Sequence, residues 1–180
     1  MLKDKVAIVT GSTSGIGLGI AKELARLRVN LVLNGFGDPG EIEAIRSGIE
    51  REHGVRVVYD GADMSKGDAV RRLIAATIET FGRLDILVNN AGIQFTAPVE
   101  EFPSAKWHAI LDINLSAAFH GIAAAVPKMK KQRWGRIVNI ASTHGLVAST
   151  HKAAYVARQA RVDRPDQGGR PGDRRQRRDL

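Results

Sequence analysis

The sequence predicts an α/β protein with a doubly wound, mostly parallel sheet in a single domain over residues 1–157. Two observations predict this fold. Short β-branched runs alternate with segments of helical spacing, and a glycine-rich turn separates the first run from the first helix. Strands that alternate with helices form parallel βαβ units, whose ligands bind at the carboxyl ends of the strands. The pattern stops after residue 157, so we expect the domain to be incomplete at its C-terminus.

Each element rests on a local pattern. The run Val6–Val9 is wholly apolar, as in a buried parallel strand, and apolar residues then recur every three or four positions from Ile16 to Leu27. Pro39 marks the start of a second helix. The same reasoning places strands at 6–9, 31–33, 55–59, 84–88 and 137–140, and helices at 16–27, 40–53, 70–81 and 107–130.

Composition narrows the class of protein. The chain has 180 residues, 43% of them hydrophobic and 26% charged, and no cysteine. These values are ordinary for a globular domain and exclude a disulfide scaffold and a cysteine nucleophile. No uninterrupted apolar stretch approaches the about 20 residues of a membrane span, and no signal peptide is visible. We therefore expect a cytoplasmic protein without a membrane partner.

The positive charge is concentrated at the end of the chain. Residues 158–180 hold eight Arg and four Asp, which gives +4 of the total net charge of +8. Few residues there are apolar, so the segment is expected to be a disordered basic tail. A basic tail is able to bind nucleic acid through phosphates. It has no aromatic side chains that could stack on bases, so nucleic acid is not the expected partner.

The turn after the first strand has the features of a phosphate-binding loop. Gly11, Gly15 and Gly17 are spaced G-x-x-x-G-x-G, and a helix begins within the turn. Glycines let the backbone approach a pyrophosphate, and the helix start offers free N–H groups. The alternative is a simple tight turn. Its position between the first strand and helix favours a dinucleotide site.

The choice of cofactor depends on the end of the second strand. Many NAD sites have an acidic residue there, which binds the ribose hydroxyls. This chain has Asn34-Gly35-Phe36, and it has no Arg or Lys at 12–14 or 34–37 to receive a 2′-phosphate. We therefore expect NAD rather than NADP. Asp63, after the third strand, is placed to accept a hydrogen bond from an adenine amino group, or else to cap the next helix.

Five elements in order resemble the short-chain dehydrogenase/reductase family. They are the glycine turn at 10–17, the run Asn89-Asn90-Ala91-Gly92, Asn114, Ser142 and Tyr155. The resemblance implies a Rossmann-like fold and an NAD-dependent oxidoreductase. It also implies the cofactor-binding residues Gly11, Thr13, Gly15, Ile16, Gly17, Phe36, Asp63, Asn90 and Gly92, and no metal.

The chemistry of alcohol oxidation agrees with these residues. A general base must remove the hydroxyl proton while hydride leaves to nicotinamide, and Tyr155 is the candidate. Ser142 would bind the substrate oxygen, and by resemblance Asn114 holds a water in a proton path. Each residue also has an alternative reading: Ser142 as a helix cap, Asn114 as a polar residue on a solvated helix face, and Tyr155 as a core aromatic.

Three donors favour a small carboxylate as substrate. Gln94, His144 and Lys152 each lie just past a strand or at the start of the helix that carries Tyr155. By resemblance these positions contact the carboxylate of a small 3-hydroxy acid. A surface lysine and a loop histidine remain alternatives. The other functions left open are a 3-oxoacyl thioester reductase and a noncatalytic nucleotide-binding protein. The family usually forms homotetramers.

The sequence departs from the family four residues after Tyr155, where Gln159 stands in place of a lysine. A neutral amide cannot lower the pKa of a phenol electrostatically, so activity of this chain is in doubt. One choice of codons for residues 158–173, read one base later, encodes a lysine at position 159. We therefore hypothesise that residues 158–180 result from a frameshift, which the nucleotide sequence of codons 150–180 would decide.

Overall fold

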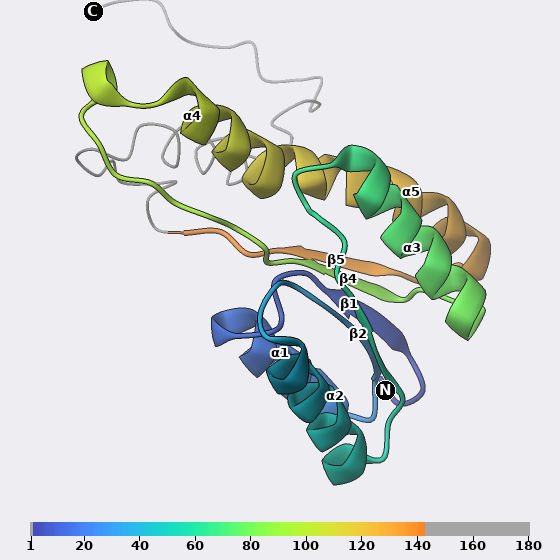
Figure 1. The fold of residues 1–180 in the computed structure, drawn as a ribbon. Coiled ribbons are helices and arrows are strands. Elements are labelled where there is room, and N and C mark those ends of the chain that lie inside the picture. Colours follow the sequence, from blue (N-terminus) through green and yellow to red (C-terminus); the bar gives the residue numbers. More distant parts are fainter. Residues whose placement is uncertain (1, 143–180) are drawn as a thin grey trace, which may run out of the picture.

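A computed structural model describes residues 2–142 of the chain and shows a five-stranded parallel sheet with the strand order β3-β2-β1-β4-β5 (Figure 1). The order reverses direction at β1, so the crevice beside β1 is the expected ligand site of a doubly wound sheet. The strands are β1 (Val6–Val9), β2 (Asn30–Asn34), β3 (Val57–Asp60), β4 (Ile86–Asn89) and β5 (Arg136–Asn139).

Helices cover both faces of the sheet. Figure 1 shows α1 and α2 on one face and α3 with α5 on the other. A short 3₁₀ turn, η1, and helix α4 lead into α5 through a π-helical segment, η2. The bounds are α1 (Gly15–Arg26), α2 (Pro39–His53), α3 (Gly67–Phe81), η1 (Val99–Glu101), α4 (Ser104–Leu111), η2 (Asp112–Ser116) and α5 (Ala117–Gln132).

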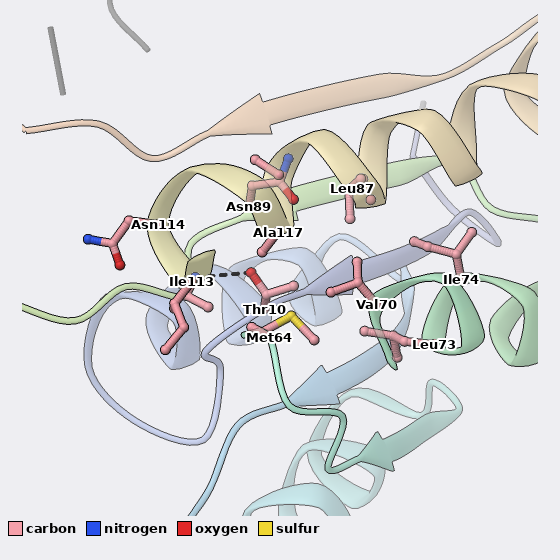
Figure 2. A pocket seen from close by; sticks show the side chains of 13 residues that line it. Thr10, Met64, Val70, Leu73, Ile74, Leu87, Asn89, Ile113, Asn114 and Ala117 are labelled. Carbon is pink, nitrogen blue, oxygen red and sulfur yellow. Dashed lines mark hydrogen bonds between the residues drawn. The ribbon is translucent and has the colours of Figure 1, made fainter. Parts of the chain in front are cut away.

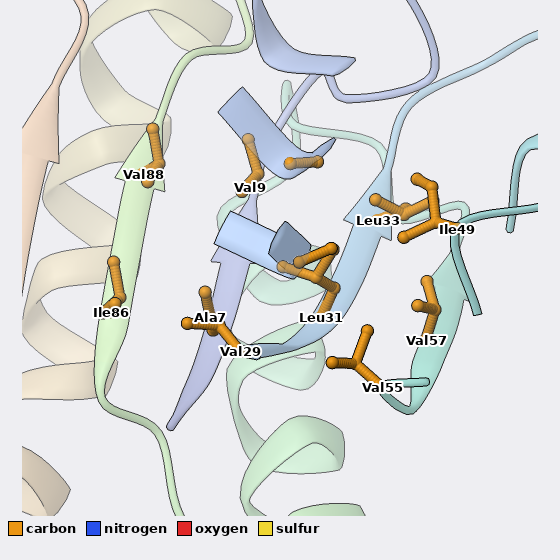
Figure 3. Close-up of a cluster of buried hydrophobic side chains, with 12 residues drawn as sticks. Ala7, Val9, Val29, Leu31, Leu33, Ile49, Val55, Val57, Ile86 and Val88 are labelled. Carbon is orange, nitrogen blue, oxygen red and sulfur yellow. The ribbon is translucent and has the colours of Figure 1, made fainter. Parts of the chain in front are cut away.

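The alternation of side chains along β1 divides the core in two. Ala7 and Val9 face α1 and α2, where they pack with Leu31 and Leu33 of β2 (Figure 3). Ile8 points to the opposite face and packs against α3 and α5. A parallel strand covered on both faces is apolar at every position, since successive side chains point to opposite faces. The unbroken apolar run is therefore explained by burial on both sides.

Helix α2 illustrates why the helices begin and end where they do. The Asp38 carboxylate accepts hydrogen bonds from the backbone N–H groups of Gly40 and Glu41, at 2.9 and 3.0 Å. Pro39 follows in the first turn, where its missing N–H costs nothing. The helix ends at Gly54, which adopts the left-handed conformation at φ 57°. The Asp38 carboxylate therefore serves as the N-terminal cap of α2.

The predicted fold class is confirmed, and so are all five strands and the first three helices within a few residues, while the helix predicted at 107–130 is observed as α4 and α5 joined by η2. The third strand begins at Val57 rather than at Val55, since the chain is still leaving the left-handed turn at Gly54. The fourth helix begins at Ser104, directly after Pro103. The predicted tail at 158–180 lies outside the described residues, and the domain boundary at 157 stays a prediction.

The expectation about membrane spans was wrong on one count. Ser104–Gln132 is a continuous helical stretch of 29 residues with a mean hydropathy of 1.5 over 18 residues, long and apolar enough to cross a membrane. The prediction failed because it considered only uninterrupted apolar runs, whereas the mean hydropathy of this helix stays high despite its scattered polar residues. Core helices pass the same test, and Ile110, Ala125 and Met129 pack inside this fold. The stretch is therefore weak support for a membrane span.

A buried ionic cluster fastens the amino ends of the central strands. Asp85, which is fully buried, accepts the backbone N–H of Val6 at 2.9 Å and two hydrogen bonds from the Arg83 guanidinium at 2.6 and 2.8 Å. Lys5 Nζ lies 3.4 Å from the same carboxylate and 4.2 Å from the centre of the Trp134 ring. Burial raises the pKa of Asp85, but the hydrogen bonds and the two cations outweigh it and lower the pKa.

We expect Asp85→Asn to lower the free energy of unfolding by about 3 kcal/mol at pH 7, because the change leaves Arg83 without its buried anionic partner. A lowered pKa stabilises the fold above the ordinary value of 3.8, and this contribution is lost as the pH falls through the folded-state pKa. The difference in free energy of unfolding between the parent and Asp85→Asn should therefore shrink only below about pH 3.8. Urea denaturation followed by tryptophan fluorescence measures it.

Asp68→Asn is the matched control, because Asp68 pairs with Arg71 at 2.8 Å while its side chain is 83% exposed. An exposed pair contributes less than about 1 kcal/mol. Equal losses in the two variants would contradict the role assigned to the buried cluster.

Candidate active site

The glycine turn after β1 is held in place by its own polar side chains. Ser12 is fully buried, and its hydroxyl donates to the Val9 carbonyl at 2.7 Å. Its backbone N–H donates to the Asn34 carbonyl at 2.6 Å, which fixes the turn against the end of β2. The turn therefore has a defined shape before any ligand arrives.

Gly17 lets α1 pack directly on this turn. A Cβ at Gly17 would overlap the Gly11 carbonyl oxygen and come 2.5 Å from Nδ2 of Asn90. Ser14 precedes the helix in an extended conformation and makes no side-chain cap. The N–H groups of the first turn have no partner within the helix, so they face the space beside the turn with a positive helix dipole. This geometry fits a pyrophosphate.

Asn90 joins the glycine turn to the end of β4. Its side-chain amide donates to the carbonyl oxygens of Thr10 and Gly11, at 2.8 and 3.0 Å. The Thr10 hydroxyl in turn accepts the backbone N–H groups of Asn90 and Ala91, both at 3.0 Å. These bonds fix the separation of β1 and β4 at the point where the strand order reverses.

A cavity of about 380 Å³ lies at this point, and it brings together every cofactor-binding residue predicted from the sequence. Its volume lies within the range typical of cofactor sites. That these side chains contact a dinucleotide stays a prediction. The predicted lining residues are Gly11, Thr13, Gly15, Ile16, Gly17, Phe36, Asp63, Asn90 and Gly92.

One end of this cavity has a large exposed aromatic ring. Phe36 is 67% exposed, although its backbone is fixed by a 3.0 Å hydrogen bond from the Thr13 hydroxyl to its carbonyl. An exposed ring on a fixed backbone offers an apolar surface at the cavity mouth, and its contact with the adenosine half of a dinucleotide stays a prediction.

Asp63 lines the first cavity and stabilises a local turn, and the expectation that it caps the next helix was wrong because Lys66 is the residue before α3. One of its carboxylate oxygens accepts hydrogen bonds from the Ser65 hydroxyl and backbone N–H, at 2.7 and 2.9 Å. These bonds and the nearby Lys66 hold the pKa of Asp63 below its usual range, so the carboxylate is charged at neutral pH. Helix α3 begins only at Gly67, after Lys66, and Asp63 is also part of the cavity wall. Its contact with adenine stays a prediction.

A second cavity of about 370 Å³ adjoins the first and shares five lining residues with it: Ile16, Asn90, Ala91, Gly92 and Ile93. It brings together three of the predicted catalytic and substrate residues: Gln94, Asn114 and Ser142. Its walls contain polar groups but no charged side chain within the described part of the chain.

Asn114 is only 1% exposed, which contradicts the alternative that it sits on a solvated helix face. Its side chain accepts the Ile93 N–H and donates to the Ile93 carbonyl, both at 2.8 Å. The π-helical segment η2 turns this residue toward the loop that carries Gln94. The structure thus gives Asn114 a positioning contact, and its role in a proton path stays a prediction.

A third, much smaller cavity of about 10 Å³ lies between β4, α3 and α5 (Figure 2). Thr10, Met64 and Leu87 are among its lining residues. This volume holds about one water molecule, so it cannot take a cofactor.

Tyr155, His144, Lys152 and Gln159 lie outside the described residues, so their predicted roles stay predictions. Within residues 2–142 no three His, Cys, Asp or Glu side chains gather in a way that could hold a metal ion.

Comparison with known proteins decides the family. The model of the family described as "short chain dehydrogenase" matches residues 5–163. The chain belongs to the short-chain dehydrogenase family. Members of this family are oxidoreductases that use NAD or NADP.

Among curated proteins, this short-chain dehydrogenase is 54% identical over 157 residues to the D-beta-hydroxybutyrate dehydrogenase of Cupriavidus necator. The match covers 87% of this chain and 60% of the relative, so the chain spans about three fifths of that protein's length.

Solved structures in the same family include both cofactors. An NAD⁺-bound xylitol dehydrogenase superposes with a TM-score of 0.82 at 32% identity, over 89% of this chain and 62% of that one. A metagenomic short-chain oxidoreductase in complex with NADP has a TM-score of 0.82 at 33% identity, over 88% and 71%. The shared fold therefore does not by itself select the cofactor of this short-chain dehydrogenase.

Sequence reasoning missed part of the wall of the first cavity. The missed residues are small or apolar, apart from Ser14 and Asn34, and none bears a charge. The sequence argument used Asn34 only as the residue that stands where many NAD sites have an acid. A polar residue at the end of an apolar strand is, however, a signal that its side chain makes a tertiary contact. The missed lining residues are Ser14, Asn34, Gly35, Ala62, Met64, Ala91, Ile93 and Ile113.

We expect Gly17→Ala to abolish measurable binding of NADH to the short-chain dehydrogenase, because the added methyl group overlaps the Gly11 carbonyl and forces α1 away from the turn. Fluorescence titration with NADH measures the loss.

Gly19→Ala is the matched control, since a Cβ at Gly19 meets nothing within 4 Å in the same helix. Alanine in a helix interior is favoured over glycine by about 1 kcal/mol. Gly19→Ala should bind NADH as the parent does and be slightly more stable. Parent-like binding by Gly17→Ala would contradict the packing argument.

Proposed function

We propose that this chain is the dinucleotide-binding and partial catalytic part of an NAD-dependent dehydrogenase that interconverts 3-hydroxybutyrate and acetoacetate. The observation that carries the proposal is the adjoining pair of cavities, one beside the glycine turn and the other lined by Gln94, Asn114 and Ser142. The 54% identity to a D-beta-hydroxybutyrate dehydrogenase supports the choice of substrate.

The roles proposed for the chain's own groups follow from their chemistry. The bound nicotinamide would accept the hydride of the secondary alcohol. Ser142 would hold the substrate hydroxyl, and Tyr155 would remove its proton. Asn114 keeps the Ile93 loop in place, so that Gln94 remains at the wall of the second cavity.

A free carboxylate is the proposed recognition element of the substrate. Gln94 offers an amide N–H at the cavity wall, and His144 and Lys152 would add donors, one of them cationic. A thioester has no anionic group at this position and gains nothing from a cation. The donor set therefore favours the free hydroxy acid over a 3-hydroxyacyl thioester.

NAD is the proposed cofactor. The wall of the first cavity contains no Arg or Lys among the described residues that could pair with a 2′-phosphate. Its one charged residue, Asp63, is anionic and would repel a phosphate near the adenosine half.

The substrate is tested by comparing the free acid with the thioester. The 180-residue chain should bind NADH, and Gln159→Lys alone should restore little turnover. A chain extended from codon 158 in the neighbouring reading frame should oxidise 3-hydroxybutyrate with NAD at a kcat/KM at least about tenfold above that for the thioester, a difference of about 1.4 kcal/mol. The absorbance of NADH measures it.

Preference of the extended chain for the thioester would replace the proposed substrate with that of a 3-oxoacyl thioester reductase. Binding of NADH without turnover of either compound would favour a noncatalytic nucleotide-binding protein.

The choice of cofactor predicts the effect of a single added charge. Ser14 lines the first cavity beside the glycine turn and is exposed. We expect Ser14→Arg to lower the Kd for NADPH about tenfold or more, since a charge-assisted hydrogen bond to phosphate contributes about 1.5–3 kcal/mol. Fluorescence titration with NADH and NADPH measures the ratio of the two affinities.

Ser14→Gln, which is long but uncharged, is the control and should leave that ratio unchanged. Tighter binding of NADPH than NADH by the parent chain would contradict the assignment of NAD.

A further inference from the structure

Asn34, the last residue of β2, connects three segments of the chain through one buried side chain. Its amide nitrogen donates to the carbonyl oxygens of Asp60 and Ala62, at 3.0 and 2.9 Å. Its amide oxygen accepts the backbone N–H of Gly11 at 3.4 Å. The residue is 1% exposed. Because the amide is directed into these contacts, it does not serve the ribose hydroxyls as an acid at the end of β2 would.

The three segments are the parts of the first cavity that would hold opposite portions of a dinucleotide. Gly11 belongs to the glycine turn beside the proposed pyrophosphate position. Asp60 and Ala62 lead directly to Asp63, the proposed partner of the adenine amino group. One side-chain amide therefore links the phosphate end and the adenine end of the cavity, together with the bonds between Ser12 and the Asn34 backbone.

The residue after Asn34 has no room for a side chain. Gly35 has φ 153°, and a Cβ there would lie 2.5 Å from the Thr13 hydroxyl oxygen. The Gly35 carbonyl accepts a 2.8 Å hydrogen bond from the Tyr59 hydroxyl, which reaches across from β3. At this end of β2 the cavity wall therefore consists of the Gly35 backbone, which the Tyr59 hydroxyl holds in place.

We propose that Asn34 is a positioning residue for the dinucleotide. It holds residues 60–63 at the distance from the glycine turn at which Asp63 can accept a hydrogen bond from the adenine amino group. Tyr59 assists by holding the Gly35 carbonyl on the same wall. The inference rests on the proposed function in one respect, namely that the ligand is an adenine dinucleotide.

The substitution Asn34→Asp isolates this role because it scarcely changes the size of the side chain. A carboxylate keeps an acceptor for Gly11 but turns a second oxygen toward the two carbonyl oxygens of Asp60 and Ala62. Two hydrogen bonds become repulsive contacts, so residues 60–63 should move away from β2. Tyr59→Phe removes only the hydroxyl and should have a smaller effect in the same direction.

The test compares NADH with its hypoxanthine analogue, which carries a carbonyl oxygen in place of the adenine amino group. Both contain the fluorescent reduced nicotinamide, so fluorescence titration of the 180-residue chain gives both values of Kd. The parent should bind NADH the more tightly. In Asn34→Asp the Kd for NADH should rise about tenfold, equivalent to about 1.4 kcal/mol, and that for the analogue should rise less.

The ratio of the two Kd values is the readout that general destabilisation would not change. It should fall toward one in Asn34→Asp and fall part of the way in Tyr59→Phe. Thr77→Val is the matched control: it removes a buried hydroxyl that donates to the Leu73 carbonyl at 2.8 Å in α3, and it should lower stability while leaving the ratio unchanged.

A parent-like ratio in a folded Asn34→Asp protein would overturn the inference, and so would a parent that binds both ligands equally well. If Asn34→Asp fails to fold, an unchanged ratio in Tyr59→Phe overturns it instead. A parent chain that binds neither ligand overturns the proposed function, and the inference falls with it.

Discussion

The close contact between α1 and the turn after β1 is the constraint on which the site depends. At Gly17 the helix lies so near the Gly11 carbonyl that no side chain fits between them, and Asn90 bonds to the same carbonyl from β4. The helix start, the turn and the strand end are therefore one rigid unit. A pyrophosphate requires this arrangement, since several N–H groups must point at it without rearrangement on binding.

The two ends of the sheet are stabilised differently, and the difference has a functional consequence. At the amino ends, the buried Asp85 carboxylate is paired with two cations, Arg83 and Lys5. At the carboxyl ends, neutral groups such as Ser12, Asn34 and Asn90 join the strands. Neutral amides and hydroxyls fix the backbone without adding a net charge, so among the described residues the charge at the cavity wall comes from Asp63, beside the helix start.

The sequence predicted those features that depend on neighbouring residues. Strand β1 and helix α1 follow from apolar spacing, and the glycine turn follows from steric need. The nine cofactor residues that the family resemblance implies all line one cavity. The sequence did not predict the contacts of Asn34 or the π-helical turn at Asn114, because each depends on segments about 20 or more residues away. A polar residue in an apolar stretch signals that such a partner exists, but not which segment provides it.

The second cavity has no charged lining residue among residues 2–142, which makes the loss of a lysine at position 159 important for catalysis. A tyrosine that acts as a base near neutral pH needs a cation to lower its pKa from about 10, and each unit corresponds to about 1.4 kcal/mol. Among residues 2–142, none of the groups that line this cavity is charged. We therefore expect the cation to come from residues beyond Ser142, where Gln159 stands in place of the family's lysine. We therefore expect cofactor binding and proton removal to depend on different parts of the chain, so that loss of the second leaves the first intact.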